Sequence, residues 1–196
     1  MAKNSKNKLG KPDIRFLYDM KEVIFDQKWF KSAKNFPLYY MYRGVKEKNG
    51  LRYDITIIPS AFLGKEFNKT KGHCHSNKYG EVYQILSGQA IYLVQKWQTN
   101  KIKDVYAVKA EKNDVVVIPP YYGHITINPG SKTLKEANWL AKSCKNIYDL
   151  FEEKHGACYY YTKSGWVKNK NYEKIPKLRF KKPLKKMPEN LDFLKG

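Results

Sequence analysis

Five runs rich in β-branched and aromatic residues dominate the middle of the chain. They begin at residues 38, 51, 81, 102 and 136, and Gly, Pro, Asn and Lys-Asn turns separate them. Such side chains pack well on a pleated, half-buried surface, and turn formers at regular spacing mark the ends of short strands. No long helical pattern interrupts this region. The sequence therefore predicts an all-β fold of the sandwich or barrel type.

Shorter helical patterns flank the β-rich region. Residues 20–33 carry apolar side chains at roughly helical spacing, which predicts a short amphipathic N-terminal helix. A second helix is predicted after the barrel, in "NIYDLFEEKHG", with Asn146 as its N-cap, Gly156 at its C-terminal stop and His155 near its negative end. The next segment indicates a hairpin that closes near residues 163–165.

The length of 196 residues allows one domain with a sizeable core but not two domains and a linker. We expect one domain over 1–196, with residues 1–12 frayed and an irregular basic tail over 178–196. No stretch approaches the roughly 18 consecutive apolar residues of a membrane helix, and the first residues lack the apolar core of a signal peptide. We expect a cytoplasmic protein with no membrane partner.

The net charge and the cysteines exclude few classes of function. The formal net charge is +20, but most of the excess is scattered lysine, which favours a solvated surface over a nucleic-acid partner. A positive field would also steer an anionic small molecule such as a phosphosugar toward a cleft. Cys74, Cys144 and Cys158 have no C-x-x-C spacing, so reduced thiols are the simplest interpretation.

The stretch "TKGHCHSNKYGEVY" contains the most specific chemistry in the chain. Alternate residues of a strand point to the same face, so His73 and His75 can direct both imidazoles to one point while Cys74 packs on the other face. Turn formers follow, and Glu81 then opens a strongly β run that can bring its carboxylate beside the imidazoles. His124, in "PPYYGHITIN", begins another strand after two prolines and can supply a further imidazole.

Three imidazoles and one carboxylate suit one divalent ion per subunit, such as iron, manganese, nickel or zinc, and the spacing does not choose among them. A single histidine is more often a surface or packing residue. The combination of a paired clamp, a carboxylate and a remote histidine favours the metal site.

The same residues resemble the two-block signature of cupins. Five residues separate His75 from Glu81, Gly88 stands at the end of the first block, and Asn113 occupies the place where cupins often have a glycine, ahead of Pro119. Asn tolerates the left-handed conformation that glycine usually adopts.

More specifically, "GKEFNKTKGHCH", "EVYQILSGQA" and "VVVIPPYYGHITIN" resemble the archaeal-type cupin glucose-6-phosphate isomerases, over about 13–177. The resemblance implies a jelly-roll-like β-barrel, a homodimer, and interconversion of glucose 6-phosphate and fructose 6-phosphate. It implies that the metal ligands are His73, His75, Glu81 and His124. It also implies catalytic roles for Glu81 and Tyr83, and substrate contacts from Tyr39, Thr56, Thr70, Gly72, Tyr83 and Tyr148. A bend at Gly72 would let Thr70 share a site with His73.

The chain departs from the family after the last barrel strand. A tyrosine and a His-Asp-Tyr triplet stand there in well-known members, whereas this chain offers Ser143 or a neighbour for the first tyrosine and 146–148 for the triplet, of which Tyr148 alone is retained. This departure keeps open a non-catalytic sugar-phosphate-binding cupin. Another metal cupin, such as a dioxygenase or a different sugar isomerase, is also open, because pocket residues set the function of this fold. For an isomerase, Glu81 could act as a base, or a metal-assisted hydride shift could replace it.

Overall fold

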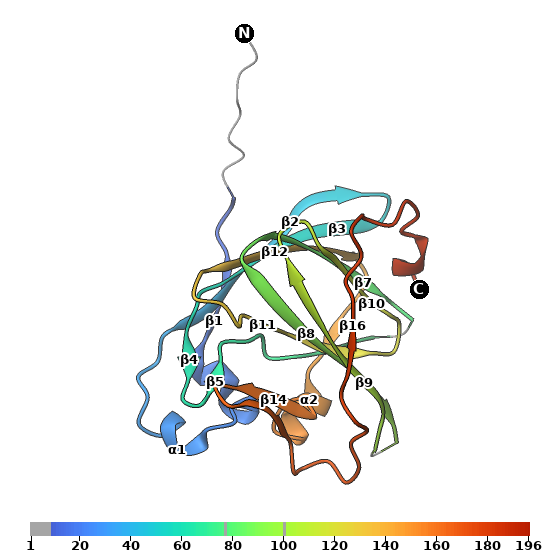
Figure 1. Ribbon diagram of the computed structural model, residues 1–196. Coiled ribbons are helices and arrows are strands. Elements are labelled where there is room, and N and C mark those ends of the chain that lie inside the picture. Colours follow the sequence, from blue (N-terminus) through green and yellow to red (C-terminus); the bar gives the residue numbers. More distant parts are fainter. Residues whose placement is uncertain (1–8, 77, 100) are drawn as a thin grey trace.

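The computed structural model describes residues 9–76, 78–99 and 101–196 (Figure 1). Two sheets form most of it, one wholly antiparallel and the other antiparallel except for its last strand. Neighbouring strands of the first sheet are, in spatial order, β1 (Asp13–Phe16), β2 (Pro37–Lys48), β3 (Leu51–Ile58), β12 (Leu134–Ala141), β7 (Glu81–Ser87) and β10 (Val115–Ile118). The second sheet joins β11 (Gly123–Ile127), β8 (Gln89–Gln98) and β9 (Lys101–Glu111) to the short strand β16 (Arg179–Lys181).

Two smaller sheets complete the fold. One pairs β6 (Cys74–His75) with β13 (Asn146–Ile147), and the other joins β4 (Phe62–Leu63), β5 (Glu66–Phe67), β14 (Tyr159–Thr162) and β15 (Gly165–Lys168). The predicted hairpin is β14–β15, in which Thr162 pairs with Gly165 across the turn. The all-β class and the cupin β-barrel are thus confirmed.

One large apolar core fills the barrel. It takes side chains from both main sheets, including Ile85 on β7, Leu93 on β8 and Ile125 on β11. β8 is buried from Ala90 to Gln95, a pattern typical of a strand that is covered on both faces. Asn113 adopts φ +74 in the turn before β10, so the left-handed conformation expected there is present.

The single N-terminal helix predicted over 20–33 is wrong in its bounds. The segment forms a 3-10 helix, η1 (Leu17–Val23), and a short helix, α1 (Gln27–Phe30). Two contacts interrupt the helical path between them, because the Phe25 N–H donates to Glu66 Oε1 at 2.7 Å and the Asp26 carboxylate accepts from the Trp29 N–H at 3.1 Å. Asp26 therefore starts a new helix instead of continuing the first.

The second predicted helix is present but shorter. α2 (Asp149–Glu153) has Tyr148 at its N-cap position, and the predicted stop lies where His155 and Gly156 adopt positive φ. The N-cap assigned to Asn146 is wrong, because Asn146 pairs with His75 in the β13–β6 ladder.

The two ends of the chain compare differently with the sequence-based expectation. Residues 1–8 of the segment expected to be frayed lie outside the described residues, and β1 begins soon after them. The C-terminal tail is not wholly irregular, since β16 runs parallel to β9 and the 3-10 helix η2 (Asp192–Leu194) buries Leu194 completely. Among the described residues no helix is long and apolar enough to cross a membrane.

Candidate metal centre

A small piece of backbone pairing places the first two imidazoles. The His73 N–H donates to the His124 carbonyl at 3.2 Å, and the His124 N–H donates to the His73 carbonyl at 3.0 Å. Residues that face each other in such an antiparallel pair present their side chains on one face. The two imidazole centroids therefore lie only 4.5 Å apart.

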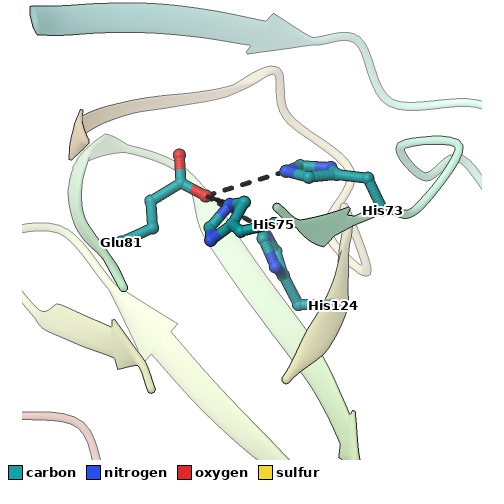
Figure 2. Close-up of side chains that lie close together, drawn as sticks. All are labelled: His73, His75, Glu81 and His124. Carbon is teal, nitrogen blue, oxygen red and sulfur yellow. Dashed lines mark hydrogen bonds and ion pairs between the residues drawn. The ribbon is translucent and has the colours of Figure 1, made fainter. Parts of the chain in front are cut away.

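The other two side chains come from different elements and point to the same place. His75 lies in β6, and Glu81 opens β7 in the six-stranded sheet. Figure 2 shows the three imidazoles gathered around the Glu81 carboxylate, whose Oε2 lies 3.1, 3.3 and 3.8 Å from the Nε2 atoms of His75, His124 and His73. The ligand atoms that the four residues offer all lie within 4.8 Å of one another, so the group could hold a metal ion.

The hydrogen bonding of the imidazoles fits a divalent cation. His75 Nδ1 lies 3.1 Å from the Tyr79 carbonyl oxygen, which requires a proton on Nδ1, so Nε2 is the atom that faces Glu81 and that His75 could offer to a metal. The Nε2 of His73 is buried and has no hydrogen-bond partner among the described residues. Imidazole nitrogens gathered around one carboxylate are the donor set of a borderline divalent metal.

Burial controls the protonation of two of these histidines. Desolvation holds the pKa of His73 well below its usual value, and the nearby His124 lowers it further. Desolvation also lowers the pKa of His124, against the opposing effect of Glu81. Both rings are therefore neutral near pH 7, which is the form that binds metals.

The Glu81 carboxylate is ionised in this setting. Burial raises the pKa of Glu81, but the hydrogen bonds with His124 and His75 outweigh it and hold the pKa well below its usual value. The same contact acts on His75, where burial lowers the pKa and the hydrogen bond with Glu81 reverses the direction. An ionised carboxylate is the form that can serve as a ligand.

One cavity contains every residue to which the sequence assigns a substrate contact. Tyr83 shares the inner face of β7 with Glu81, and its hydroxyl lies 2.9 Å from His124 Nε2. The walls include the catalytic and substrate-contact candidates Tyr39, Thr56, Thr70, Gly72, Glu81, Tyr83 and Tyr148, together with His73. His75 and His124 lie behind them, against Glu81. The structure thus brings together all of the predicted site residues.

The bend expected at Gly72 is present. Gly72 has φ +87, and a Cβ at this position would lie 2.5 Å from Ile125 and 2.7 Å from Phe151, so only glycine fits. The bend lets Thr70 pair with Thr126 through the backbone while His73 faces the imidazole cluster. In a regular strand Thr70 and His73 would point to opposite faces, and the bend removes this difference.

The sequence analysis missed a set of charged and polar residues on the cavity wall. They are Arg43 on β2, Arg52 and Asp54 on β3, and Glu136 and Asn138 on β12. A signal was present in the sequence, because Arg52, Asp54 and Thr56 alternate along one strand, as do Glu136 and Asn138 along another. Polar residues at every second position of a mostly buried strand indicate a polar interior.

Lys71 also lies on the cavity wall, between the predicted substrate contacts Thr70 and Gly72. Its Nζ forms an ion pair with Glu152 at 2.6 Å and lies 5.9 Å from the centroid of the Tyr148 ring. The lysine charge is thus compensated on the side of α2.

The segment that departs from the family lies partly in the cavity. Asn146 and Tyr148 line it, as does Leu140. The Ser143 hydroxyl instead bonds to the Tyr79 hydroxyl at 2.9 Å. Cys74 packs against the core beside Gly123, where an added Cβ would lie 2.8 Å from its Sγ, as expected for a packing residue.

Comparison with known proteins agrees with the site. The family model described as glucose-6-phosphate isomerase matches residues 15–177. The glucose-6-phosphate isomerase of Pyrococcus abyssi is 35% identical over 129 residues, and that of Pyrococcus furiosus is 34% identical over 129 residues. Each alignment covers 63% of this chain and 66% of the relative, so the match spans slightly less than two thirds of these proteins.

Among solved structures, the oxalate decarboxylase formate complex of Lactobacillus farciminis is 19% identical, with a TM-score of 0.43, over 53% of this chain and 29% of that chain.

The family model covers most of the sequence, including all four side chains of the cluster and the cavity residues around them. The chain belongs to the glucose-6-phosphate isomerase family.

Proposed function

We propose that this protein interconverts glucose 6-phosphate and fructose 6-phosphate, an aldose-ketose isomerisation of glycolysis and gluconeogenesis, and that it needs one divalent metal ion per subunit. One observation carries the proposal: the cluster of three imidazoles and the Glu81 carboxylate borders, through His73 and Glu81, a cavity with hydroxyl groups suited to a phosphate. The proposed ligands are His73, His75, Glu81 and His124, and the candidate ions are iron, manganese, nickel and zinc. When bound, the ion would act as a Lewis acid on the oxygens of the open-chain sugar.

The phosphate end of the substrate is assigned to Thr56, Thr70, Gly72 and Tyr39. The Thr70 Oγ1 accepts from the Thr126 N–H at 2.9 Å, and the Tyr39 hydroxyl accepts from the Lys71 N–H at 3.2 Å. Because each hydroxyl already accepts a hydrogen bond, its own proton remains for a phosphate oxygen. Tyr148, whose ring centroid lies 5.9 Å from that of His73, and Tyr83, whose centroid lies 5.5 Å from that of His124, are assigned to the sugar.

Isomerisation moves a hydrogen between C1 and C2, and we assign the proton transfer to Glu81. Its Oε2 faces the histidines, so Oε1 is the oxygen that would take the proton. Isomerisation in D2O tests this assignment. With fructose 6-phosphate as substrate, incorporation of deuterium at C2 of the glucose 6-phosphate formed supports proton transfer, whereas complete retention of the substrate hydrogen indicates a hydride shift.

Asn146 stands on the cavity wall at the place compared above with the family histidine. An amide neither gains nor loses a proton near neutral pH, so we assign no proton transfer to this position. This difference is the observation behind the alternative of a sugar-phosphate-binding protein without turnover.

The proposal is tested on the full chain, stripped with a chelator and reloaded with single metals. We expect conversion of fructose 6-phosphate in a coupled assay with at least one metal, and its loss in His73→Ala. The matched control is His155→Ala, because His155 contacts the Glu22 carbonyl at 3.2 Å, away from the cluster, and should keep activity. Sugar-phosphate binding without turnover under any metal would contradict the enzyme, and oxygen consumption would favour a dioxygenase.

We also propose a homodimer, acting in the cytoplasm. β1 is the outermost strand of the six-stranded sheet, and Ile14, Phe16 and Tyr18 around it are 39%, 37% and 54% exposed. An edge strand with apolar side chains is suited to pairing with a second copy. Light scattering should give twice the chain mass and a monomer for Ile14→Lys, and cell fractionation tests the location.

A further inference from the structure

Asn138 is a buried polar residue on β12, next to the strand that carries Glu81. It is 5% exposed, lines the cavity, and pairs in register with Tyr83 on β7 and Asp54 on β3. Its side chain therefore projects from the floor of the six-stranded sheet toward the candidate metal centre.

The amide of Asn138 makes one short contact there. Its Nδ2 donates to Glu81 Oε1 at 2.6 Å. Glu81 is 2% exposed, and its other oxygen, Oε2, is the one nearest to the three imidazoles. The carboxylate is thus divided, with one oxygen held by the amide and the other facing the ligand cluster.

We infer that Asn138 is a positioning residue that fixes Glu81 as a ligand through one oxygen, Oε2. This inference rests on the proposed metal dependence. The NH2 group of an amide donates hydrogen bonds and carries no charge. It can therefore hold Oε1 without adding a positive charge that competes with the metal ion for the carboxylate. A carboxylate held in advance loses less rotamer freedom when a metal binds, and partners of metal ligands commonly tune affinity in this way.

The test measures metal affinity apart from turnover. Co²⁺ is titrated into the chelator-stripped full chain by calorimetry, for the natural protein, Asn138→Ala and Asn138→Leu. Loss of the contact should weaken Co²⁺ binding about 10–100-fold, the usual effect of removing a partner of a ligand. The visible absorption bands of bound Co²⁺ should also change, because Glu81 would be free to bind through both oxygens.

Two comparisons separate positioning from damage to the fold. Thr56→Val removes another polar group from the cavity wall and should leave Co²⁺ affinity unchanged. In a Glu81→Gln background, Asn138→Leu should change Co²⁺ affinity by less than about twofold, because no carboxylate remains to be positioned. Asn138→Ala guards against a failure of the larger leucine to fit.

The outcomes distinguish the two proposals. If Asn138→Ala and Asn138→Leu bind Co²⁺ as tightly as the natural protein, the positioning role is wrong. It is also wrong if Asn138→Leu weakens Co²⁺ binding as much in the Glu81→Gln background as it does with Glu81 present. If Asn138→Leu weakens Co²⁺ binding as expected while the natural protein does not isomerise the sugar, the positioning role stands and the proposed activity fails.

Discussion

Glu136 lies on the cavity wall with 1% of its surface exposed. Burial raises its pKa to about 8, although hydrogen bonds with Tyr92 and Thr126 lower it in part. A glutamate in the unfolded chain has a pKa of about 4.3. Between these two values the folded protein binds more protons than the unfolded chain, so this group makes the folded state less stable as the pH rises.

We predict that Glu136→Gln changes the pH dependence of stability. Near pH 5 the natural carboxyl is protonated in the folded state, and the variant should melt at a similar temperature. Near pH 9 the folded carboxylate is ionised and buried, so the variant should melt at a higher temperature than the natural protein. Melting curves of both proteins at the two pH values check this, and parallel curves would contradict it.

Gly72 occupies a position that requires glycine, because it combines positive φ with close contacts to Ile125 and Phe151. We predict that Gly72→Ala lowers the free energy of unfolding by about 1–3 kcal/mol, since a side chain there is strained and overpacked. It should also weaken inorganic phosphate binding, which calorimetry measures. Gly165→Ala is the comparison, because it shares positive φ but a Cβ there meets no atom within 4 Å.

At the scale of elements, a buried ion pair connects the helical N-terminal segment to the barrel. Lys69 Nζ lies 2.6 Å from Glu66 Oε2 and donates to the Val23 carbonyl at 2.8 Å, while Glu66 Oε1 accepts from the Phe25 N–H. Both side chains are almost completely buried. The pair therefore holds the junction between η1 and α1.

We predict that Lys69→Met lowers the free energy of unfolding by about 3–5 kcal/mol, because it leaves the Glu66 carboxylate buried without its partner. The double variant Lys69→Met with Glu66→Gln should lose less, since no buried charge remains. Urea unfolding measures both. A double variant less stable than the single one would show that the charge is not the source of the loss.

At this scale the sequence predicts the elements that local residues determine, and it does not predict those that depend on distant contacts. The central strands follow from β-branched runs and turn residues, which act locally. The break between η1 and α1 depends on Glu66, which is distant in the sequence, and the pairing of Asn146 with His75 overrides a plausible helix start. At the site, the histidines and Glu81 could be found from spacing. Alternation along β12 marks Asn138 as a residue of a polar interior, but its contact with Glu81 could not be predicted, because that contact depends on the pairing of β12 with β7.

At the scale of the whole molecule, the net charge of +20 bears on binding to nucleic acid. We predict binding to duplex DNA weaker than about 10⁻⁶ M at physiological salt, with no preference for sequence, as for scattered charge. Fluorescence anisotropy at low and moderate salt measures this. DNA binding that stays tight as the salt concentration rises would contradict this prediction and indicate that the lysines form a nucleic-acid-binding surface.

The C-terminal tail stabilises a second apolar cluster. Leu194 is fully buried in it with Leu51, Val82 and Val115, whereas Leu184, earlier in the tail, is 46% exposed. We predict that Leu194→Ala lowers the free energy of unfolding by about 2–5 kcal/mol, the usual effect of a cavity at a buried leucine. Leu184→Ala should change it by less than about 0.5 kcal/mol. Equal effects in urea unfolding would contradict the role of the tail.

The parallel pairing of β16 with β9 has a consequence for the order of folding (Figure 1). β9 is synthesised long before Arg179 can join it, and Leu194 follows later still, so closing this part of the molecule requires a long loop to be ordered. During synthesis the cluster around Val82 and Val115 is exposed to solvent and to other chains. Leu194 must emerge from the ribosome before it can cover this cluster.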